Sequence, residues 1–207
     1  MARNPQWRGS VATWRDRVAH WIGRSRPDDL LAVDIFFDML GVHGDTALVD
    51  TIWRDAFDAA RGQAAFAKLL VDAAGPVGPG FTLFRRIRTE QGRIDLKRSG
   101  LFGIVSAARA LAICHHVVGR ATPARLEGIK ALRIGGAEDL DALLEAQGTF
   151  LDLLAAQQVA DVEQGVPPSN AVLVRPLSRV SRERLTFALD SVAHLGEFTH
   201  DLLFRGE

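Results

Sequence analysis

The spacing of apolar and polar positions predicts a chain built mostly of helices. Near the N-terminus, large apolar residues recur at alternating intervals of four and three: Trp7, Val11, Trp14, Val18 and Trp21. This spacing places them on one face of a helix. Asn4 and Pro5 have the residue types favoured at a helix cap and first helical position, so we expect the helix to begin there. Three indole rings on one face predict a large buried contact.

Similar periodicity divides the rest of the chain into helices with short connections. We expect helices from after Pro27 to near Gly41, from an Asp45 cap to Arg61, over 63–74, from Ser99 to about Val118, from a Thr122 cap with Pro123 at the first position to Ile134, over 140–165 and over 185–202. Pro167 and Pro168 stop the long helix before them. Long amphipathic helices with short connections predict an all-α fold, an antiparallel helical bundle.

Residues 76–98 interrupt this pattern. The sequence PVGPG at Pro76–Gly80 is incompatible with a helix. Phe81–Arg88 and Arg93–Lys97 are joined through Glu90, Gln91 and Gly92, which predicts a small β-hairpin with glycine in the left-handed conformation. We therefore expect residues 1–207 to form one helical domain, with 76–98 as a loop and hairpin insertion.

Composition narrows the function classes. The formal net charge is zero, which argues against a general nucleic-acid or anionic-membrane binder. Cys114 is the sole cysteine, so an internal disulfide is impossible and a cysteine-based zinc site is not expected. No apolar run is long enough to cross a membrane, and the N-terminus lacks an apolar signal core. We expect a cytoplasmic protein with no membrane association.

The segment Ile35–Asp45 carries the first candidate chemistry. Asp38, His43 and Asp45 surround a glycine-containing helix break after an almost wholly apolar run. They could bind a cation, a sugar hydroxyl or an amine. Alternatively, Asp45 caps the next helix and Asp38 pairs with an arginine, since a carboxylate beside two phenylalanines needs a partner. Both interpretations stay open for Asp38.

Asp95 and Lys97 lie two residues apart on the predicted hairpin. They could face a ligand with opposite charges, but an ion pair at the base of the hairpin is the simpler interpretation. Lys97 remains a candidate phosphate contact, because it stands where the strand gives way to a helix.

Arg109 lies at the edge of its helix's apolar face, and His116 follows two turns later. An arginine and histidine at this spacing also occur in HEPN-type ribonucleases, a hypothesis that the zero net charge disfavours. Arg109 is better placed to pair with a buried carboxylate such as Asp38. His115 falls within the apolar face, which predicts a hydrogen-bonded core histidine.

Gln147 and Gln158 fall on the apolar stripe of the long helix. Buried amides need partners, so they indicate either an interhelical hydrogen-bond network or a polar pocket between helices. The chain lacks a P-loop, GxGxxG, HExxH and the paired carboxylates with which a nucleotidyltransferase sheet holds magnesium. We therefore expect no catalytic residue, no metal ligand and no cofactor in this segment.

The order and spacing of several short motifs resemble one family. These motifs are IFFDMLGVHGD at Ile35–Asp45, RIDLK at Arg93–Lys97, AARALA at Ala107–Ala112, TPARL at Thr122–Leu126, PPSN at Pro167–Asn170 and RERL at Arg182–Leu185. Together they resemble the substrate-binding domain that follows the catalytic domain in DUF294-type predicted nucleotidyltransferases of bacteria, over nearly the whole chain. The start, with Asn4 and Trp7, resembles the junction after the catalytic domain, which implies a C-terminal piece of a longer protein.

The resemblance implies a bundle like the C-terminal domain of aminoglycoside nucleotidyltransferases, and a signal-transduction role like that of PII uridylyltransferases. It adds Gly44, Arg125 and Asn170 to the positions that match the family pattern. Two positions depart from it, because Leu40 and Leu154 stand where arginine is common, and Gly41 replaces a proline. The loss of two basic side chains argues against an anionic substrate; alternatively, those arginines have a structural role in the family and the bundle is repacked here.

We therefore expect a domain that positions an acceptor for nucleotidyl transfer by a missing catalytic domain of the same parent chain, which would bring the nucleoside triphosphate and magnesium. The acceptor is unknown and could be a protein. The expected substrate-binding residues are Asp38, His43, Asp45, Lys97, Arg109, Arg125 and Gln158. We expect one polar cleft formed by Ile35–Asp45, Lys97 and the helix that carries Arg109. The alternative is a protein-interaction or homodimerisation module without a small-molecule site; a HEPN-like ribonuclease ranks last.

Overall fold

The computed structural model describes residues 4–74, 80–82 and 84–204. Its helices are α1 (Val11–Arg24), α2 (Leu30–Phe37), α3 (Thr46–Ala60), α4 (Ala64–Ala74), α5 (Phe102–Cys114), α6 (Thr122–Ala131), α7 (Ala137–Glu163), α8 (Arg179–Val192) and α9 (Leu195–Phe204). Short helical turns η1 (Pro5–Trp7), η2 (Pro27–Asp29) and η3 (Lys97–Leu101) and strands β1 (Arg93–Asp95) and β2 (Ala171–Leu173) complete the fold. The predicted all-α class with a small antiparallel β element is confirmed. The predicted loop at 76–79 lies outside the described residues.

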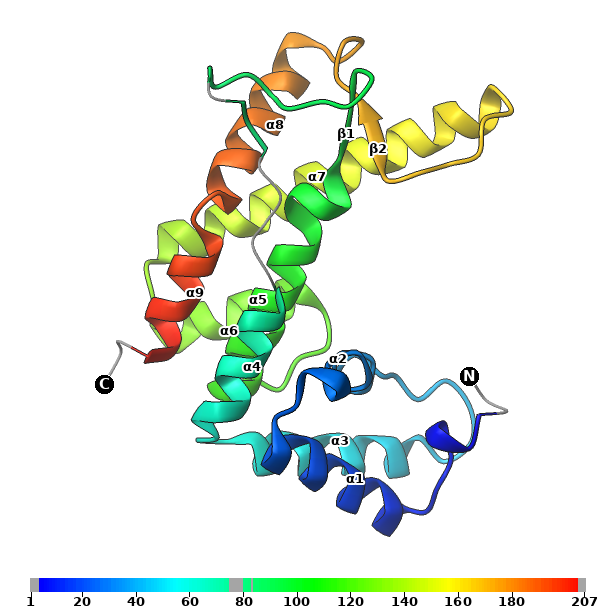
Figure 1. The fold of residues 1–207 in the computed structure, drawn as a ribbon, viewed down its shortest axis with the longest axis vertical. Coiled ribbons are helices and arrows are strands. Elements are labelled where there is room, and N and C mark those ends of the chain that lie inside the picture. The colour runs from blue at the N-terminus through cyan, green and yellow to red at the C-terminus, as the bar shows by residue number, and fades with distance from the viewer. Residues whose placement is uncertain (1–3, 75–79, 83, 205–207) are drawn as a thin grey trace.

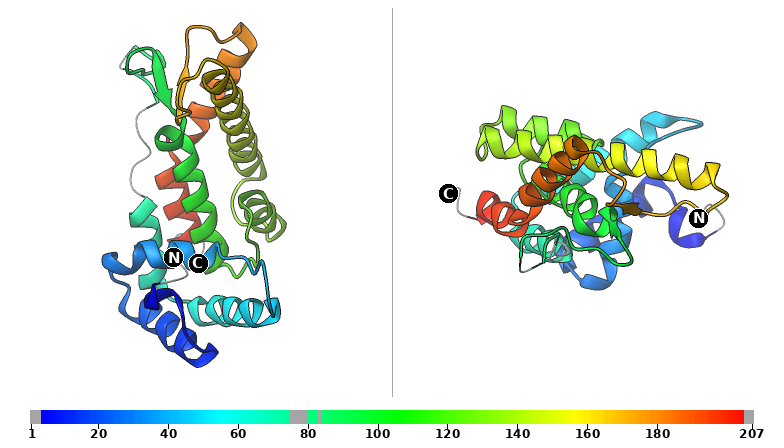
Figure 2. Two further views of the ribbon diagram at one scale, coloured as in Figure 1. Left: turned by 90° about the vertical axis from the view of Figure 1, so that its right-hand side faces the viewer. Right: turned by 90° about the horizontal axis from the view of Figure 1, so that it is seen from above.

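The molecule is elongated (Figures 1 and 2). Helices α1, α2 and α3 form one end, while β1, β2 and the first turns of α8 form the other. Helix α5 runs between these ends and packs against α4, α6 and α9, while α7 packs along α8.

Helix α5 belongs to both hydrophobic clusters of the protein. Ile104, Ala108 and Leu111 lie in the main core, formed chiefly with α6, α7 and α8. Ala110 and Ile113 instead join the N-terminal core, formed by α1 to α4. The sequence predicts one apolar face for this helix, but nearly all of α5 is buried. Its alanines explain this, because small side chains let helices approach from several sides.

The N-terminal helix begins later than predicted. Asn4 accepts a hydrogen bond from the backbone of Gln6 and caps only the single turn η1. The chain is then extended, and α1 starts after Ser10, whose hydroxyl accepts from the Thr13 N–H. Gly9 has a low helix propensity and Ser10 is a preferred cap, which accounts for the break. Trp7 nevertheless packs on Trp14, with ring centroids 6.1 Å apart.

Other helix ends also differ from the prediction. Helix α2 ends at Phe37 rather than near Gly41, and α5 ends at Cys114 rather than at Val118. After α5, His116 takes a left-handed conformation, and the Val117 N–H donates to the Ala112 carbonyl. This is the hydrogen-bond pattern of a Schellman cap. Thr122 is the first residue of α6, not a side-chain cap. The sequence predicts one final helix, but the structure has two, because a tight turn at Ala193 and His194 separates α8 from α9.

The strand pairing corrects the predicted hairpin. The turn itself is present: Gln91 and Gly92 both have positive φ, and Glu90 and Arg93 exchange backbone hydrogen bonds. Strand β1, however, pairs with β2 in an antiparallel register that places Ile94 opposite Val172. Both of these side chains are buried in the main core. Burial of this pair explains the choice of partner. In the described part of 81–88, an isolated bridge joins Phe81 to Ile87.

Within the described residues, no helix combines the length and the apolar character that a bilayer crossing demands.

Candidate functional site

Four charged side chains meet where α2 contacts α5 and α6, and we call Asp34, Asp38, Arg109 and Arg125 the charged cluster. Arg109 donates to Asp38 through Nη2 at 2.6 Å and Nε at 3.3 Å, and to Asp34 through Nη1 at 2.6 Å. Arg125 Nη2 lies 2.7 Å from Asp38 Oδ1, the same oxygen that accepts from Arg109 Nε. The predicted pairing of Asp38 with Arg109 is confirmed, and the resemblance-derived Arg125 joins it.

The two carboxylates of the charged cluster differ in their electrostatics. Burial raises the pKa of Asp38, but the hydrogen bonds and charges of Arg109 and Arg125 outweigh it and hold this pKa below its usual value. Burial also raises the pKa of Asp34, and this effect exceeds the lowering by Arg109, so the pKa of Asp34 lies above its usual value. Asp34 bonds to one arginine only and is repelled by Asp38. Asp38 is therefore the carboxylate on which the arginines depend.

The C-terminal end of α2 is held by side chains instead of by further helical turns. The Phe37 carbonyl accepts hydrogen bonds from Trp53 Nε1 and Arg125 Nη2, each at 3.0 Å. The Met39 carbonyl accepts one from Arg120 Nε at 2.9 Å. These bonds satisfy carbonyls that a helix end leaves free. The arrangement fastens α2 to α5 and α6, and every charged group in it has a partner.

A different polar site lies between η3, the start of α5 and the middle of α7. It is a pocket of about 440 Å³ whose polar lining residues are Lys97, Gln147, Gln158 and Asn170. Its apolar walls are Leu101, Phe102, Val105, Leu151, Leu154 and Ala155. We call it the amide pocket. Ligand pockets in proteins are of this size and combine apolar walls with a few polar groups.

Gln147 is the unusual residue of the amide pocket. Its side chain is almost fully buried, at 8% exposure, and its carbonyl oxygen Oε1 has no hydrogen-bond partner. An unsatisfied buried oxygen costs about 1–3 kcal/mol. The predicted interhelical network is therefore absent at Gln147. Gln158, by contrast, donates to the Ser169 carbonyl at 3.0 Å.

The backbone around the amide pocket is also specialised. Residues Lys97–Leu101 form a π-helical turn rather than an α-helical one, and such turns occur often at functional sites. Gly100 lets this turn approach α7 closely, because a Cβ at this position would lie 2.1 Å from the Phe150 ring. The turn places Lys97 and Leu101 on the pocket wall.

The single cleft expected from the sequence is not present. Lys97 lines the amide pocket, whereas Arg109 belongs to the charged cluster. Twelve residues of nearly continuous helix separate them, which corresponds to about 18 Å at the α-helical rise. Lys97 and Arg109 therefore belong to two different sites.

Residues 64–202 match the family described as "Putative nucleotidyltransferase substrate binding domain". The chain belongs to this family. Residues 1–28 match a second family, described as "Putative nucleotidyltransferase DUF294". The searches of curated proteins and of solved structures found no match.

The remaining predicted residues of this substrate-binding domain have local roles. Asp45 caps α3 by accepting from Ala47 N–H, and His43 is exposed in the preceding loop, outside the charged cluster and the amide pocket. The predicted Asp95–Lys97 ion pair is wrong, because Asp95 instead accepts from the Arg98 N–H at the start of the π-helical turn.

Two histidines and the cysteine are explained by packing. His115 Nε2 lies 3.2 Å from the Leu202 carbonyl, so the neutral ring donates from Nε2. The predicted hydrogen bond is confirmed, but the side chain is only partly buried rather than part of the core. His116 Nε2 lies 3.4 Å from Asp58 Oδ1, whereas its buried Nδ1 has no hydrogen-bond partner among the described residues. Arg109 is paired with two carboxylates, so its guanidinium is not available for the role that the HEPN hypothesis gives it. Burial raises the pKa of Cys114 to about 12, which makes its thiol unreactive.

Asp34 and Arg120 were not among the residues predicted from the sequence. Asp34 stands four residues before Asp38, so both carboxylates share one face of a short, otherwise apolar helix. That spacing was the feature that could have revealed it. Arg120 lies in a loop, where its contacts with Asp50 and the Trp53 ring have no counterpart in the sequence pattern.

Proposed function

We propose that this domain binds the acceptor substrate of a nucleotidyltransferase in the amide pocket and orients it for attack on a nucleoside triphosphate held by a catalytic domain. The observation that supports this is the unsatisfied Gln147 oxygen in a pocket of ligand size. A lone carbonyl oxygen accepts a hydrogen bond, and an acceptor hydroxyl or amine donates one. The contribution of this domain is orientation rather than chemistry.

The walls of the amide pocket define the class of acceptor. Leu101, Phe102 and Leu151 supply an apolar surface, and Lys97 supplies a positive charge at the edge. Leu154 is part of the same wall, at a position where the family resemblance implies arginine. The acceptor of this member is therefore a hydroxyl or amine compound, or a protein side chain, with an apolar body and little negative charge.

A substitution at Gln147 tests this proposal. Gln147→Leu removes an unsatisfied oxygen and keeps the volume, so we expect the domain to be as stable as the wild type or more stable, by about 1 kcal/mol. In the parent enzyme, with acceptors identified by a mass-spectrometric screen for nucleotidylated products, the same variant should raise the KM for the acceptor and leave the KM for the nucleotide unchanged. A destabilised variant with unchanged acceptor kinetics would show that Gln147 is only structural.

The isolated domain gives a second test. Incubated with labelled nucleoside triphosphates and magnesium, the 207-residue chain should release no pyrophosphate, because within its described residues no group of three or more His, Cys, Asp or Glu could hold a metal ion. Metal-dependent turnover that persists through repurification would contradict the proposed division of labour.

The runner-up is an interaction module, and exposed apolar residues favour it. Leu40 and Val42, in the loop after α2, and Leu48, in the first turn of α3, are largely exposed. Exposed apolar groups of this kind occur at protein contacts. If they form a homodimer contact, sedimentation of the isolated chain should show a dimer that Val42→Asp converts to a monomer. If they contact the catalytic domain, the isolated chain should be monomeric.

A further inference from the structure

Positive charge is concentrated at one end of this neutral protein. Residues 80–100 contain six basic and two acidic side chains, and residues 174–186 contain four basic and one acidic, a net charge of +7 for the two segments. The β1–β2 pairing and the 3.0 Å hydrogen bond from Val174 N–H to the Gly92 carbonyl bring these segments together. The rest of the chain carries the compensating −7.

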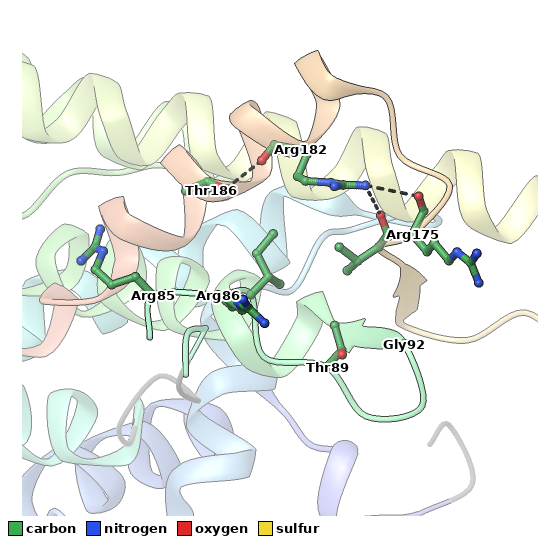
Figure 3. A pocket seen from close by; sticks show the side chains of 9 residues that line it. Arg85, Arg86, Thr89, Gly92, Arg175, Arg182 and Thr186 are labelled. Atoms are coloured by element: carbon green, nitrogen blue, oxygen red, sulfur yellow. Dashed lines mark hydrogen bonds between the residues drawn. The ribbon is translucent and has the colours of Figure 1, made fainter. Parts of the chain in front are cut away.

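A cavity of about 500 Å³ lies within this basic end, between residues 85–92 and the start of α8 (Figure 3). Four arginines line it: Arg85, Arg86, Arg175 and Arg182. Thr89 and Thr186 add hydroxyl groups, and none of the nine lining residues is acidic. We call this site the arginine cavity. It shares no lining residue with the amide pocket.

Two of the arginines are held in place by protein partners. Arg182 Nη2 lies 3.2–3.5 Å from the carbonyl oxygens of Val174, Arg175 and Leu177, in the turn that precedes α8. Arg85 donates to both oxygens of Asp190, at 2.8 and 3.0 Å. These contacts fix the guanidinium groups at two sides of the cavity.

The other two arginines have no such partner. The side chains of Arg86 and Arg175 are exposed, and no hydrogen bond or ion pair joins either of them to a residue in the described part of the chain. Four like charges around one cavity repel one another. Bound anionic groups would relieve that repulsion and satisfy the free donors.

We propose that the arginine cavity binds a small molecule with two or more linked phosphate groups, either inorganic pyrophosphate or the phosphate chain of a nucleotide. A guanidinium group donates two parallel hydrogen bonds to a phosphate, which makes arginine the preferred residue for such groups. Arg86 and Arg175 contact the phosphates directly, while Arg85 and Arg182 add positive charge. The volume of the cavity suits a small molecule.

Isothermal titration calorimetry of the 207-residue chain tests the proposal. The probes are inorganic phosphate, pyrophosphate, AMP, ATP and a single-stranded oligonucleotide, each without magnesium. Arg86→Gln and Arg175→Gln remove the free arginines. Arg54→Gln is the matched control, because it removes one exposed arginine from α3, at the opposite end of the molecule.

We expect saturable binding of pyrophosphate and ATP, with inorganic phosphate and AMP much weaker. Each cavity variant should weaken pyrophosphate binding about ten- to hundredfold, the usual effect of one charge-assisted contact, while Arg54→Gln should not. Tighter binding of ATP than of pyrophosphate would identify the nucleotide as the source of the phosphate chain; equal binding would identify pyrophosphate.

The proposal is overturned if pyrophosphate and ATP do not saturate, if the cavity variants bind as the wild type does, or if Arg54→Gln weakens binding equally. It is also overturned if the oligonucleotide binds more tightly than pyrophosphate. None of these outcomes depends on the acceptor pocket, which the Gln147→Leu kinetics test separately.

Discussion

Replacement of Asp38 by asparagine should show how far the charged cluster stabilises the fold. Asparagine keeps the size of the side chain and removes the charge that two arginines share. Arg109 lies with only 8% of its side chain exposed and Arg125 with 1%, so both depend on protein partners rather than on water. Because the folded-state pKa of Asp38 is below its usual value of 3.8, this stabilisation is present at neutral pH and is lost as the pH falls through that lowered pKa.

The expected magnitude follows from what remains after the substitution. Leaving a buried charge without its partner costs about 3–5 kcal/mol. Asp38 is itself 37% exposed, Arg109 keeps Asp34, and Arg125 keeps the carbonyls of Phe37 and Gly119. Solvent screening and the remaining partners reduce the cost of Asp38→Asn to about 2–3 kcal/mol. Arg125→Gln should cost about 3–5 kcal/mol, because Arg125 is fully buried.

Urea unfolding at neutral pH measures these costs through the midpoint and slope of the transition. The four tryptophans all lie in or against the N-terminal core, so their fluorescence reports on α1 to α3, whereas circular dichroism reports on every helix. Asp38→Asn should lower the fluorescence midpoint at least as much as the dichroism midpoint. Asp55→Asn is the matched control, because its partner Arg15 is 53% exposed and the pair should contribute less than about 1 kcal/mol.

A double-mutant cycle decides whether the contact itself is responsible. Asp38→Asn combined with Arg125→Gln should cost less than the sum of the single substitutions, by about 1–2 kcal/mol. Strict additivity, or a loss no larger than that of Asp55→Asn, would refute the conclusion that the charged cluster fastens α2 to α5 and α6.

Three further substitutions test the packing and the titration of the domain. Trp14→Ala should cost about 2–4 kcal/mol in the same urea assay, because Trp14 stacks on Phe36 but is only partly buried, and an unchanged midpoint would mean that α1 is not docked. Gly100→Ala should cost about 1–3 kcal/mol by forcing Phe150 away from η3, and a stable variant would contradict the close approach. Burial lowers the pKa of His115 despite its hydrogen bond to Leu202, so the contribution of His115 to stability should be complete above pH 6.5 and should decrease as the pH falls below that value. His115→Gln should remove this part of the pH dependence. An unchanged stability profile in the variant would show that His115 is not its source.

The sequence predicted the helices well and their ends less well. Helical periodicity located every long helix, because an apolar face is a property of consecutive residues. The early end of α2 was not predictable in this way, since Trp53 and Arg125 satisfy its last carbonyls from 16 and 88 residues away. The partner of β1 was missed for the same reason: burial of Ile94 against Val172 is a contact between distant segments.

The candidate site shows the same limit. The pairing of Asp38 with Arg109 followed from the need of each buried charge for a partner. The separation of Asp38 and Arg109 from Lys97 could not be predicted, because the sequence does not show that η3 and α5 form one nearly continuous helix. The basic end was also missed, since a neutral composition conceals charges that only the fold brings together.

Hydrogen bonding separates the structural polar groups of this domain from those available to ligands. In the charged cluster every arginine and carboxylate has a partner, so substitution there should reduce stability. The Gln147 oxygen and the guanidinium groups of Arg86 and Arg175 lack partners, although their neighbours are well ordered by hydrogen bonds. The buried, unsatisfied Gln147 oxygen reduces stability, and the exposed side chains of Arg86 and Arg175 are open to water, so replacing any of the three should preserve or increase stability. Variants that keep the fold and lose binding would therefore locate function at the amide pocket and the arginine cavity, away from the charged cluster.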